Sequence, residues 1–175
     1  HNSFLTFLIN KKDKKTGIIN FQGSNPDEIA LVTAAYEFGF SFISRENNII
    51  TIEIYDHSSE KKVTKTFEIL QKFDFSSERQ RSSIIVRDLS SKQIILYLKG
   101  SDKKVFESID DCSYKNVNNK TKIHVDQFAK QGLRTLCYSF KYIKEDEYKK
   151  WLKEYNEMKY KYINNKSLLN QLELS

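Results

Sequence analysis

The stretch Phe73–Asp102 decides how the rest of the chain is interpreted, and it reads FDFSSERQRSSIIVRDLSSKQIILYLKGSD. Two strand-like segments, Ser83–Arg87 and Gln93–Lys99, lie inside it, and a polar turn lies at each end. The first turn carries an aromatic ring, hydroxyls and arginines, and the second places Lys99 before Gly100. An aromatic face and convergent cations suit a planar base joined to phosphates, and glycine lets backbone approach a ligand closely. The stretch therefore favours a nucleotide site.

The flanking sequence extends this stretch into a sheet with helices. Apolar alternation from Phe40 to Lys99, broken by short polar linkers, predicts an antiparallel meander. Pro26, Asp27 and Glu28 are typical of a helix N-terminus, and Gly39 is typical of a helix end. The expected fold is α+β: a twisted, mainly antiparallel sheet flanked by helices, in one domain over residues 1–175. Strands are expected at 4–9, 18–21, 40–43, 49–55, 63–73, 83–87, 93–99 and 133–143, helices at 26–38, 102–109, 123–131, 145–162 and 164–175, and a flexible loop at 110–120.

Composition places the chain among globular proteins. It has 175 residues, of which 39% are hydrophobic and 13% aromatic. No run approaches the roughly 20 apolar residues of a membrane-spanning helix. The chain begins at His1 without a leader, so we expect it to be a piece of a longer protein. Cys112 and Cys137 are too few for a disulfide scaffold, which favours a reducing compartment.

Several common kinds of site have no signature in the sequence. Neither a Gly-x-x-x-x-Gly-Lys-Ser/Thr loop nor a Gly-x-Gly-x-x-Gly motif is present. The three histidines are scattered, without cysteines or carboxylates at zinc-ligand spacing. The net charge of +6 comes from lysines interspersed with carboxylates, as on an ordinary solvated surface.

Five blocks of the sequence resemble, in the same order, segments of the P4-type ATPases, the phospholipid flippases. Gln22–Val32 resembles their Ser-Pro-Asp-Glu-x-Ala-Leu segment, and Phe75–Ser83 resembles Phe-x-Ser-x-Arg-Lys-Arg-Met-Ser. Tyr97–Asp102 is similar to Lys-Gly-Ala-Asp, and Phe128–Cys137 to Phe-Ala-x-Glu-Gly-Leu-Arg-Thr-Leu. Tyr148–Tyr155 resembles the Tyr-x-x-Trp-x-x-x-Tyr that follows. Several blocks in one order are a specific signal.

The resemblance implies a nucleotide-binding domain that delivers ATP to an aspartate in a separate phosphorylation domain. Phe75 would stack on adenine, and Glu28 would help to hold the adenosine end. Lys99 and Gly100 would line the base pocket, and Arg134 would approach the phosphates. Arg79 and Ser83 of the second block would be secondary contacts. The implied ATP-binding set is Glu28, Phe75, Arg79, Ser83, Lys99, Gly100 and Arg134, with no catalytic residue and no metal ligand in this chain.

The resemblance also implies partners in a parent enzyme, a phospholipid-translocating P-type ATPase. These are the phosphorylation and actuator domains, an accessory subunit, Mg²⁺, and a phospholipid bound by a membrane domain, with this domain at the cytoplasmic face. The fragment alone would bind ATP without turning it over. Asp13–Gly17 is superficially similar to the phosphorylation motif of such pumps, but its extra lysine and its place in a hairpin turn make it a decoy.

Two other functions stay open. Gln80, Ser82 and Ser101 stand where the family usually has lysine, methionine and alanine, so an interaction domain with weak or lost ATP binding is one alternative. A basic nucleic-acid-binding module is the other, suggested by the positive charge and by ten tyrosines and twelve phenylalanines. The strand periodicity predicts that most aromatic side chains are buried, which argues against nucleic acid as a partner.

Overall fold

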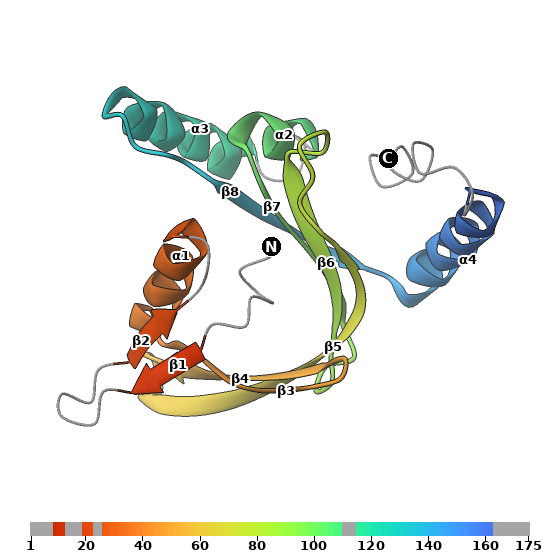
Figure 1. The fold of residues 1–175 in the computed structure, drawn as a ribbon, viewed down its shortest axis with the longest axis horizontal. Helices are drawn as coiled ribbons and strands as arrows, with labels where there is room; N and C mark the ends of the chain where they lie inside the picture. Colours follow the sequence, from red (N-terminus) through yellow and green to blue (C-terminus); the bar gives the residue numbers. More distant parts are fainter. Residues whose placement is uncertain (1–8, 13–18, 23–25, 110–114, 163–175) are drawn as a thin grey trace. The chain divides into compact units, whose positions relative to one another are not determined.

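The computed structural model of the chain describes residues 9–12, 19–22, 26–109 and 115–162. These residues form strands β1 to β8 and helices α1 to α4 (Figure 1). No helix in this part of the chain is both long enough and apolar enough to cross a bilayer. In chain order the elements are β1 (Ile9–Lys12), β2 (Ile19–Gln22), α1 (Pro26–Glu37), β3 (Phe40–Glu46), β4 (Ile49–Asp56), β5 (Lys61–Phe73), β6 (Arg81–Asp88), β7 (Ile94–Gly100), α2 (Asp102–Glu107), α3 (Lys115–Lys130), β8 (Cys137–Ile143) and α4 (Glu145–Tyr162).

Six strands form one open sheet in the order β3-β4-β5-β6-β7-β8, and β1 pairs with β2 in a separate two-stranded sheet. Strand pairs β3–β4, β4–β5 and β7–β8 are antiparallel, which confirms the predicted α+β class. The chain divides into two compact units, one from residues 1–71 and 86–93 and the other from residues 72–85 and 94–175. The prediction of a single domain over residues 1–175 stays a prediction.

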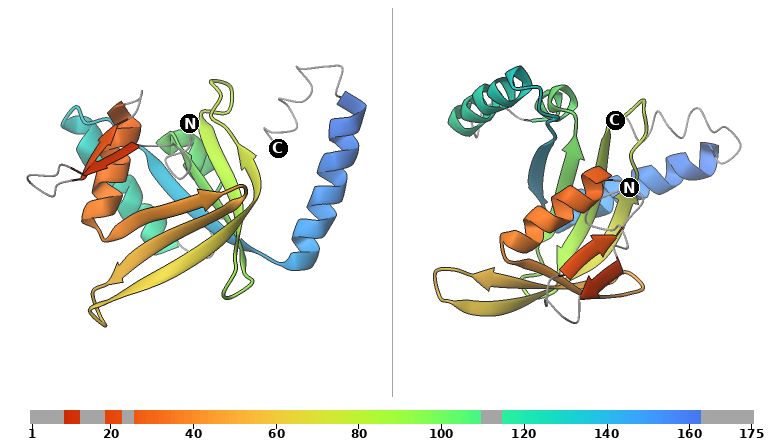
Figure 2. Two further views of the ribbon diagram at one scale, coloured as in Figure 1. Left: turned by 60° about the horizontal axis from the view of Figure 1, so that its bottom comes forward. Right: turned by 60° about the vertical axis from the view of Figure 1, so that its left-hand side comes forward.

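In the first unit, α1 begins and ends where the sequence predicts. Pro26 is its first residue, and Asp27 and Glu28 lie in its first turn, where negative charge interacts favourably with the helix dipole. Gly39 follows the helix with a φ of +89°, a left-handed conformation that favours glycine. The helix contacts β2 and β3, beside which the two further views draw it (Figure 2).

Asp88, the last residue of β6, organises the turn that follows it in the first unit. Its Oδ1 accepts from the N–H groups of Ser90 and Ser91 at 2.8 and 3.2 Å. Its Oδ2 forms an ion pair with Lys65 Nζ at 3.2 Å. Burial would raise the pKa of Asp88, but these hydrogen bonds outweigh burial and hold the pKa well below its ordinary value. The carboxylate therefore stabilises the fold while it is ionised.

Asp88→Asn is expected to weaken the acid sensitivity of unfolding. Because the folded pKa lies below the unfolded value of about 3.9, the stabilisation is present above that pH and is lost as the pH falls through the folded pKa. We expect the variant to lose about 1–3 kcal/mol of unfolding free energy at neutral pH. It should then lose less than the parent chain between pH ~4 and ~2. Urea unfolding at a series of pH values measures both effects.

Asp56→Asn is the matched control for this prediction. Hydrogen bonds from Ser58 and Ser59 lower the pKa of Asp56 to about 2, in the same kind of turn. Asp56 lies at a more exposed turn, after β4, so its removal should change stability less. Equal losses in the two variants at every pH would contradict the role assigned to Asp88.

The second unit has its own apolar core around β7 and the β8 strand that pairs with it. Ser101 is the N-cap of α2, because its Oγ accepts from the N–H of Lys104 at 3.4 Å. Helix α2 contacts both β7 and β8. The buried residues of this core are Phe73, Ile84, Ile85, Ile94, Ile95, Val105, Cys137, Tyr148 and Tyr155.

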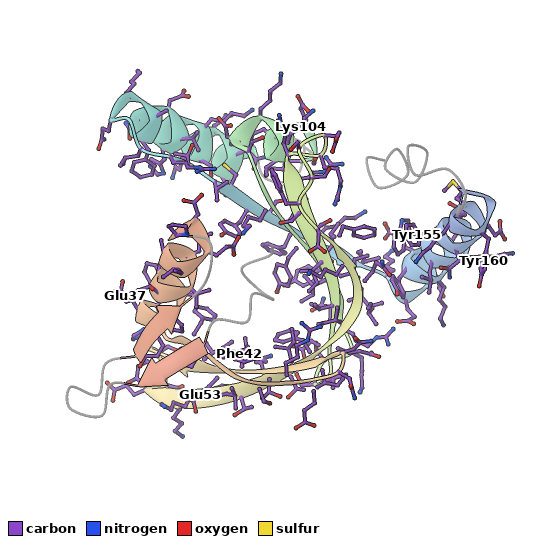
Figure 3. The ribbon with its side chains drawn as sticks, in the orientation of Figure 1. Glu37, Phe42, Glu53, Lys104, Tyr155 and Tyr160 are labelled. Atoms are coloured by element: carbon purple, nitrogen blue, oxygen red, sulfur yellow. The ribbon has the colours of Figure 1, made fainter. Side chains whose placement is uncertain are left out.

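Helix α4 contributes one aromatic face to this core, at the spacing that the sequence predicts. The rings of Trp151 and Tyr155 stack at 5.1 Å between centroids. Phe73, the last residue of β5, meets Trp151 edge-on at 6.1 Å and Tyr155 at 5.8 Å. Tyr155 is 7% exposed, whereas Tyr160 is 80% exposed (Figure 3). The face of α4 that carries Trp151 and Tyr155 is therefore the one that packs against Phe73.

The structure corrects the prediction for residues 115–122. The sequence predicts a loop over 110–120 and a helix only from 123, but α3 begins at Lys115. Val117, Thr121 and Val125 are spaced four apart and form one face of the helix. The asparagines and lysines between them hide this helical signal in the sequence. Residues 110–114, the decoy turn at Asp13–Gly17, the expected strand over 4–8 and the expected helix over 164–175 lie outside the described residues.

The boundaries of several strands also differ from the prediction. Strand β1 occupies Ile9–Lys12 and so extends beyond the predicted strand at 4–9. Strand β3 ends at Glu46 and not at 43. Strand β8 begins at Cys137 and not at 133, because Gly132 with a φ of +76° and the hydrogen bond from Leu133 N–H to Phe128 O still belong to the end of α3.

The prediction that most aromatic side chains are buried is wrong for the described residues. Strands β3 and β8 are the two edges of the sheet, so each has a neighbouring strand on one side only. Their aromatic side chains, together with several elsewhere, reach solvent. The exposed aromatic residues are Tyr36, Phe38, Phe40, Phe42, Tyr55, Phe75, Phe128, Tyr138, Phe140, Tyr142 and Tyr160.

Candidate functional site

The end of β7 and the turn after β5 lie against each other within the second unit. The N–H of Ser101 donates to the carbonyl of Gln80 at 3.1 Å. A Cβ added to Gly100 would lie 2.7 Å from the Arg81 Cβ and 2.7 Å from the Gln80 carbonyl oxygen. Only glycine allows this approach without displacing backbone. The structure thus brings together two segments that the sequence predicts to share a site.

Lys99 on β7 and Ser82 on β6 lie opposite each other. The hydrogen bond between Ser101 and Gln80 sets this antiparallel register. One residue further along each strand, Arg81 lies opposite Gly100, and one residue beyond that Ser82 lies opposite Lys99. Lys99 also pairs with Tyr138 on β8. Because directly opposed residues share a side of the sheet, Ser82, Lys99 and Tyr138 form one transverse row. We call the side of β6–β8 that carries these three residues the Lys99 face.

Ser82 is a residue that the sequence prediction leaves out of the site. It is 1% exposed, and its hydroxyl has no hydrogen-bond partner among the residues that the structure describes. Burying a hydroxyl without a partner is costly, so such a group calls for a specific explanation. A serine inside the apolar strand Arg81–Asp88, at a position where the resembling family usually has methionine, is the signal that could have identified it.

Ser83 lies on the opposite side of β6 from Ser82, because successive strand residues alternate. Its Oγ accepts from Arg79 Nη2 at 3.1 Å. The Arg79 guanidinium also lies over the ring of Phe73, 5.4 Å from its centroid. Arg79 and Ser83 are both buried, with exposures of 5% and 6%. The two residues therefore belong to the α4 side of this unit and not to the Lys99 face.

Phe75 offers an accessible ring beside this arrangement. It lies in the turn between β5 and β6 and is 55% exposed. The turn closes with a hydrogen bond from Gln80 N–H to Ser76 O at 2.8 Å, and Gln80 has a left-handed φ of +49°. An exposed aromatic ring on a closed turn is a surface on which a planar group can stack.

The remaining predicted residues lie further from this turn in sequence. Arg134 is exposed and lies in the connection between α3 and β8, in the second unit. Glu28 belongs to the first unit, where it is 4% exposed in the first turn of α1. Of the seven predicted residues, the structure brings Arg79, Ser83, Lys99 and Gly100 to one hairpin, with Phe75 on the turn that leads into it.

The described residues near the hairpin offer neither a set of metal ligands nor a reactive thiol. The described residues contain no cluster of three or more His, Cys, Asp or Glu side chains that could hold a metal ion. Cys137 pairs with Gly100 and is a buried free thiol. Burial, with a smaller contribution from Asp102, raises its pKa, so the thiol stays protonated at neutral pH.

The chain is similar to known proteins over most of its length. A family model described as "P-type ATPase, cytoplasmic domain N" matches residues 6–173. The chain is 38% identical over 151 residues to "Probable phospholipid-transporting ATPase 11" of Arabidopsis thaliana, which covers 86% of the chain and 12% of that protein. It is 40% identical over 143 residues to "Phospholipid-transporting ATPase IC" of Homo sapiens, which covers 82% of the chain and 11% of that protein. The chain thus spans about one eighth of the length of these relatives.

Proposed function

The chain belongs to the family of the cytoplasmic N domain of P-type ATPases, and on this premise we propose that it binds ATP for a phospholipid-transporting ATPase. ATP bound here phosphorylates an aspartate that another domain of the parent protein carries. Phosphoryl transfer depends largely on positioning and on charge neutralisation, and this domain contributes positioning. By itself the chain binds ATP and does not turn it over.

One observation carries the proposal: the exposed Phe75 turn is bonded to the end of the strand that carries Lys99. The bond from Ser101 to Gln80 and the approach at Gly100 join these two segments directly. An accessible aromatic ring can stack on a base, and a lysine is a cation that suits a nucleotide.

The residues present fit a nucleotide in distinct roles. Phe75 stacks on the base, Lys99 approaches it from the Lys99 face, and Gly100 keeps that approach open. Arg134 is exposed and cationic, which suits a phosphate contact. The role of Glu28 at the adenosine end stays a prediction from the family resemblance.

The proposal extends to the parent protein through the names of the relatives. The parent translocates a phospholipid through a membrane domain, uses Mg²⁺ with ATP, and contains phosphorylation and actuator domains. This domain lies at the cytoplasmic face of the membrane, and the parent associates with an accessory subunit. The family to which the chain belongs supports this, as does its similarity to phospholipid-transporting ATPases, about one eighth of whose length the chain spans.

Phe75→Ala is expected to weaken ATP binding by about 5- to 150-fold, because stacking of a base on an aromatic ring contributes about 1–3 kcal/mol. ATP titration followed by amide chemical shifts around Phe75 and Lys99 measures the affinity. Phe38→Ala is the control, because Phe38 is also an exposed phenylalanine, at 73%, and does not belong to the predicted ATP-binding set. Equal affinities of Phe75→Ala and Phe38→Ala would refute the stacking role.

An interaction domain that has lost ATP is the second candidate function. The observation in its favour is the exposed aromatic pair Tyr138 and Phe140, which alternate along β8 and so lie on the Lys99 face. Such exposed aromatic surface also suits a protein partner. No shift in the unfolding temperature with millimolar ATP would favour this alternative. Binding of oligonucleotides with a steep salt dependence would favour the nucleic-acid module instead.

A further inference from the structure

Arg79 bonds to the residues on both sides of Phe75, with its side chain on one side and its backbone N–H on the other. Its Nη1 donates to the carbonyl of Asp74 at 3.0 Å, directly before Phe75. Its own N–H donates to the Oγ of Ser76 at 3.2 Å, directly after Phe75. The guanidinium therefore fixes the backbone directly before Phe75, and the position of the Phe75 Cα depends on the Arg79 side chain through this bond to Asp74. The bond to Ser76 comes from backbone that any residue at position 79 would keep.

The guanidinium that holds the Asp74 carbonyl is itself anchored on the α4 side. Its Nη2 donates to Ser83 Oγ at 3.1 Å, and its centre lies 5.4 Å from the centroid of the Phe73 ring. Arg79 is 5% exposed, so little of it reaches solvent or a ligand there. By contrast, Lys99 projects on the opposite side of the β6–β7 hairpin. Arg79 is therefore directed away from the groups that would contact a nucleotide.

Phe73 connects this anchor to helix α4. Its ring contacts Trp151 at 6.1 Å and Tyr155 at 5.8 Å, and those two rings stack on each other. A continuous set of contacts thus runs from α4 through Phe73 and Arg79 to the turn that carries Phe75. We propose that Arg79 is a positioning residue that fixes the Phe75 turn to the α4 side of the domain and does not touch the nucleotide.

The proposal rests on the proposed function for its ligand and deepens it. An exposed ring on a free turn would lose conformational freedom each time a base stacked on it. Arg79 already restricts the turn in the nucleotide-free protein. The entropy that the turn loses when a base stacks on Phe75 is therefore smaller. The residue thus acts on affinity for the base, although it lies on the other side of the hairpin.

Arg79→Met tests the proposal, because methionine keeps an unbranched stem over Phe73 and removes every donor of the guanidinium. We expect its affinities for ATP and for adenosine to fall by the same factor, about five- to ten-fold. Arg81→Met is the matched control: Arg81 lies two residues away, and its Nη1 donates to Ser108 Oγ at 2.8 Å. The control should leave both affinities unchanged.

The pair of ligands separates the possible roles of Arg79. A fall in affinity for ATP with unchanged affinity for adenosine would mean that Arg79 contacts the phosphates, and it would overturn the proposal. Unchanged affinities for both ligands in folded Arg79→Met would reduce Arg79 to a structural residue, and would overturn it too. If Arg79→Met does not fold, Ser83→Ala replaces it, because that variant removes only the far anchor of the guanidinium. The same equal fall, smaller in size, is then expected.

A measurement without ligand keeps this inference separate from the proposed function. Hydrogen exchange of the Gln80 amide, which donates to Ser76 O, reports how firmly the turn is closed. We expect exchange to be about ten-fold faster in Arg79→Met than in Arg81→Met. Equal rates would overturn the positioning role. If the unmodified chain binds neither ATP nor adenosine, the proposed function fails, while the exchange rates still decide the role of Arg79.

Discussion

Phe73→Ala should lower the free energy of unfolding of the second unit by about 3–5 kcal/mol, the range for removing a buried phenylalanine. Phe73 is 8% exposed, and its ring is the edge-on partner of both Trp151 and Tyr155. Its loss leaves a cavity between the end of β5 and helix α4, and it also removes the ring beneath the Arg79 guanidinium. The effect should be among the largest of any single substitution in this unit.

Fluorescence can follow this substitution directly, because Trp151 is the only tryptophan in the chain. In Phe73→Ala the Trp151 emission should shift to longer wavelength at lower urea concentration than in the unmodified chain. Phe75→Ala is the matched control, since its ring is 55% exposed and contributes little to the core. Unfolding midpoints that are equal for the two variants would show that Phe73 does not hold α4 to the strands.

Gly100→Ala should lower stability by about 1–3 kcal/mol or more, and should weaken ATP binding at the same time. Its new Cβ would lie 2.7 Å from the Arg81 Cβ and from the Gln80 carbonyl oxygen, and 3.0 Å from the Arg81 Cα. Real Cβ atoms do not approach so closely, and two of these three atoms belong to backbone that cannot move alone. The end of β7 must therefore move away from the Phe75 turn, which changes the position of Lys99 relative to that turn.

Gly132→Ala separates the effect of crowding from the effect of backbone conformation. Gly132 has a φ of +76°, and an added Cβ would meet nothing within 4 Å. The control should cost about 1–2 kcal/mol through left-handed strain alone and should leave ATP affinity unchanged. Chemical denaturation and ATP titration of both variants distinguish the cases. Unaltered ATP affinity in Gly100→Ala would contradict the close approach that joins the two segments.

Local signals in the sequence located several elements correctly. Helix α1 has its proline and carboxylates at the start and a glycine after its end, and α4 has aromatic residues at helical spacing. Both patterns depend on residues within a few positions of one another, so they can be recognised without the rest of the fold. The start of α3 was missed because a polar helix shows little hydrophobic periodicity.

Burial of the aromatic residues was predicted wrongly, because alternation along a strand does not show whether that strand has a neighbouring strand on one side or on both. Tyr138, Phe140 and Tyr142 alternate as residues of a half-buried strand should. Strand β8 is nevertheless an edge of the sheet, and these three side chains are 46–58% exposed. The position of a strand in the sheet depends on pairing between distant segments.

The order of short sequence blocks was by itself enough to identify the family and the candidate site residues. Each block is an unbroken run of residues, so it can be recognised without the fold. The side of the hairpin on which each residue lies was decided only by the tertiary structure. Ser82 and Ser83 are adjacent in sequence and identical in chemistry, yet one faces Lys99 and the other holds Arg79. The physical reason is that a side chain's neighbours in a sheet are set by register across strands, and register comes from backbone hydrogen bonds such as that between Ser101 and Gln80.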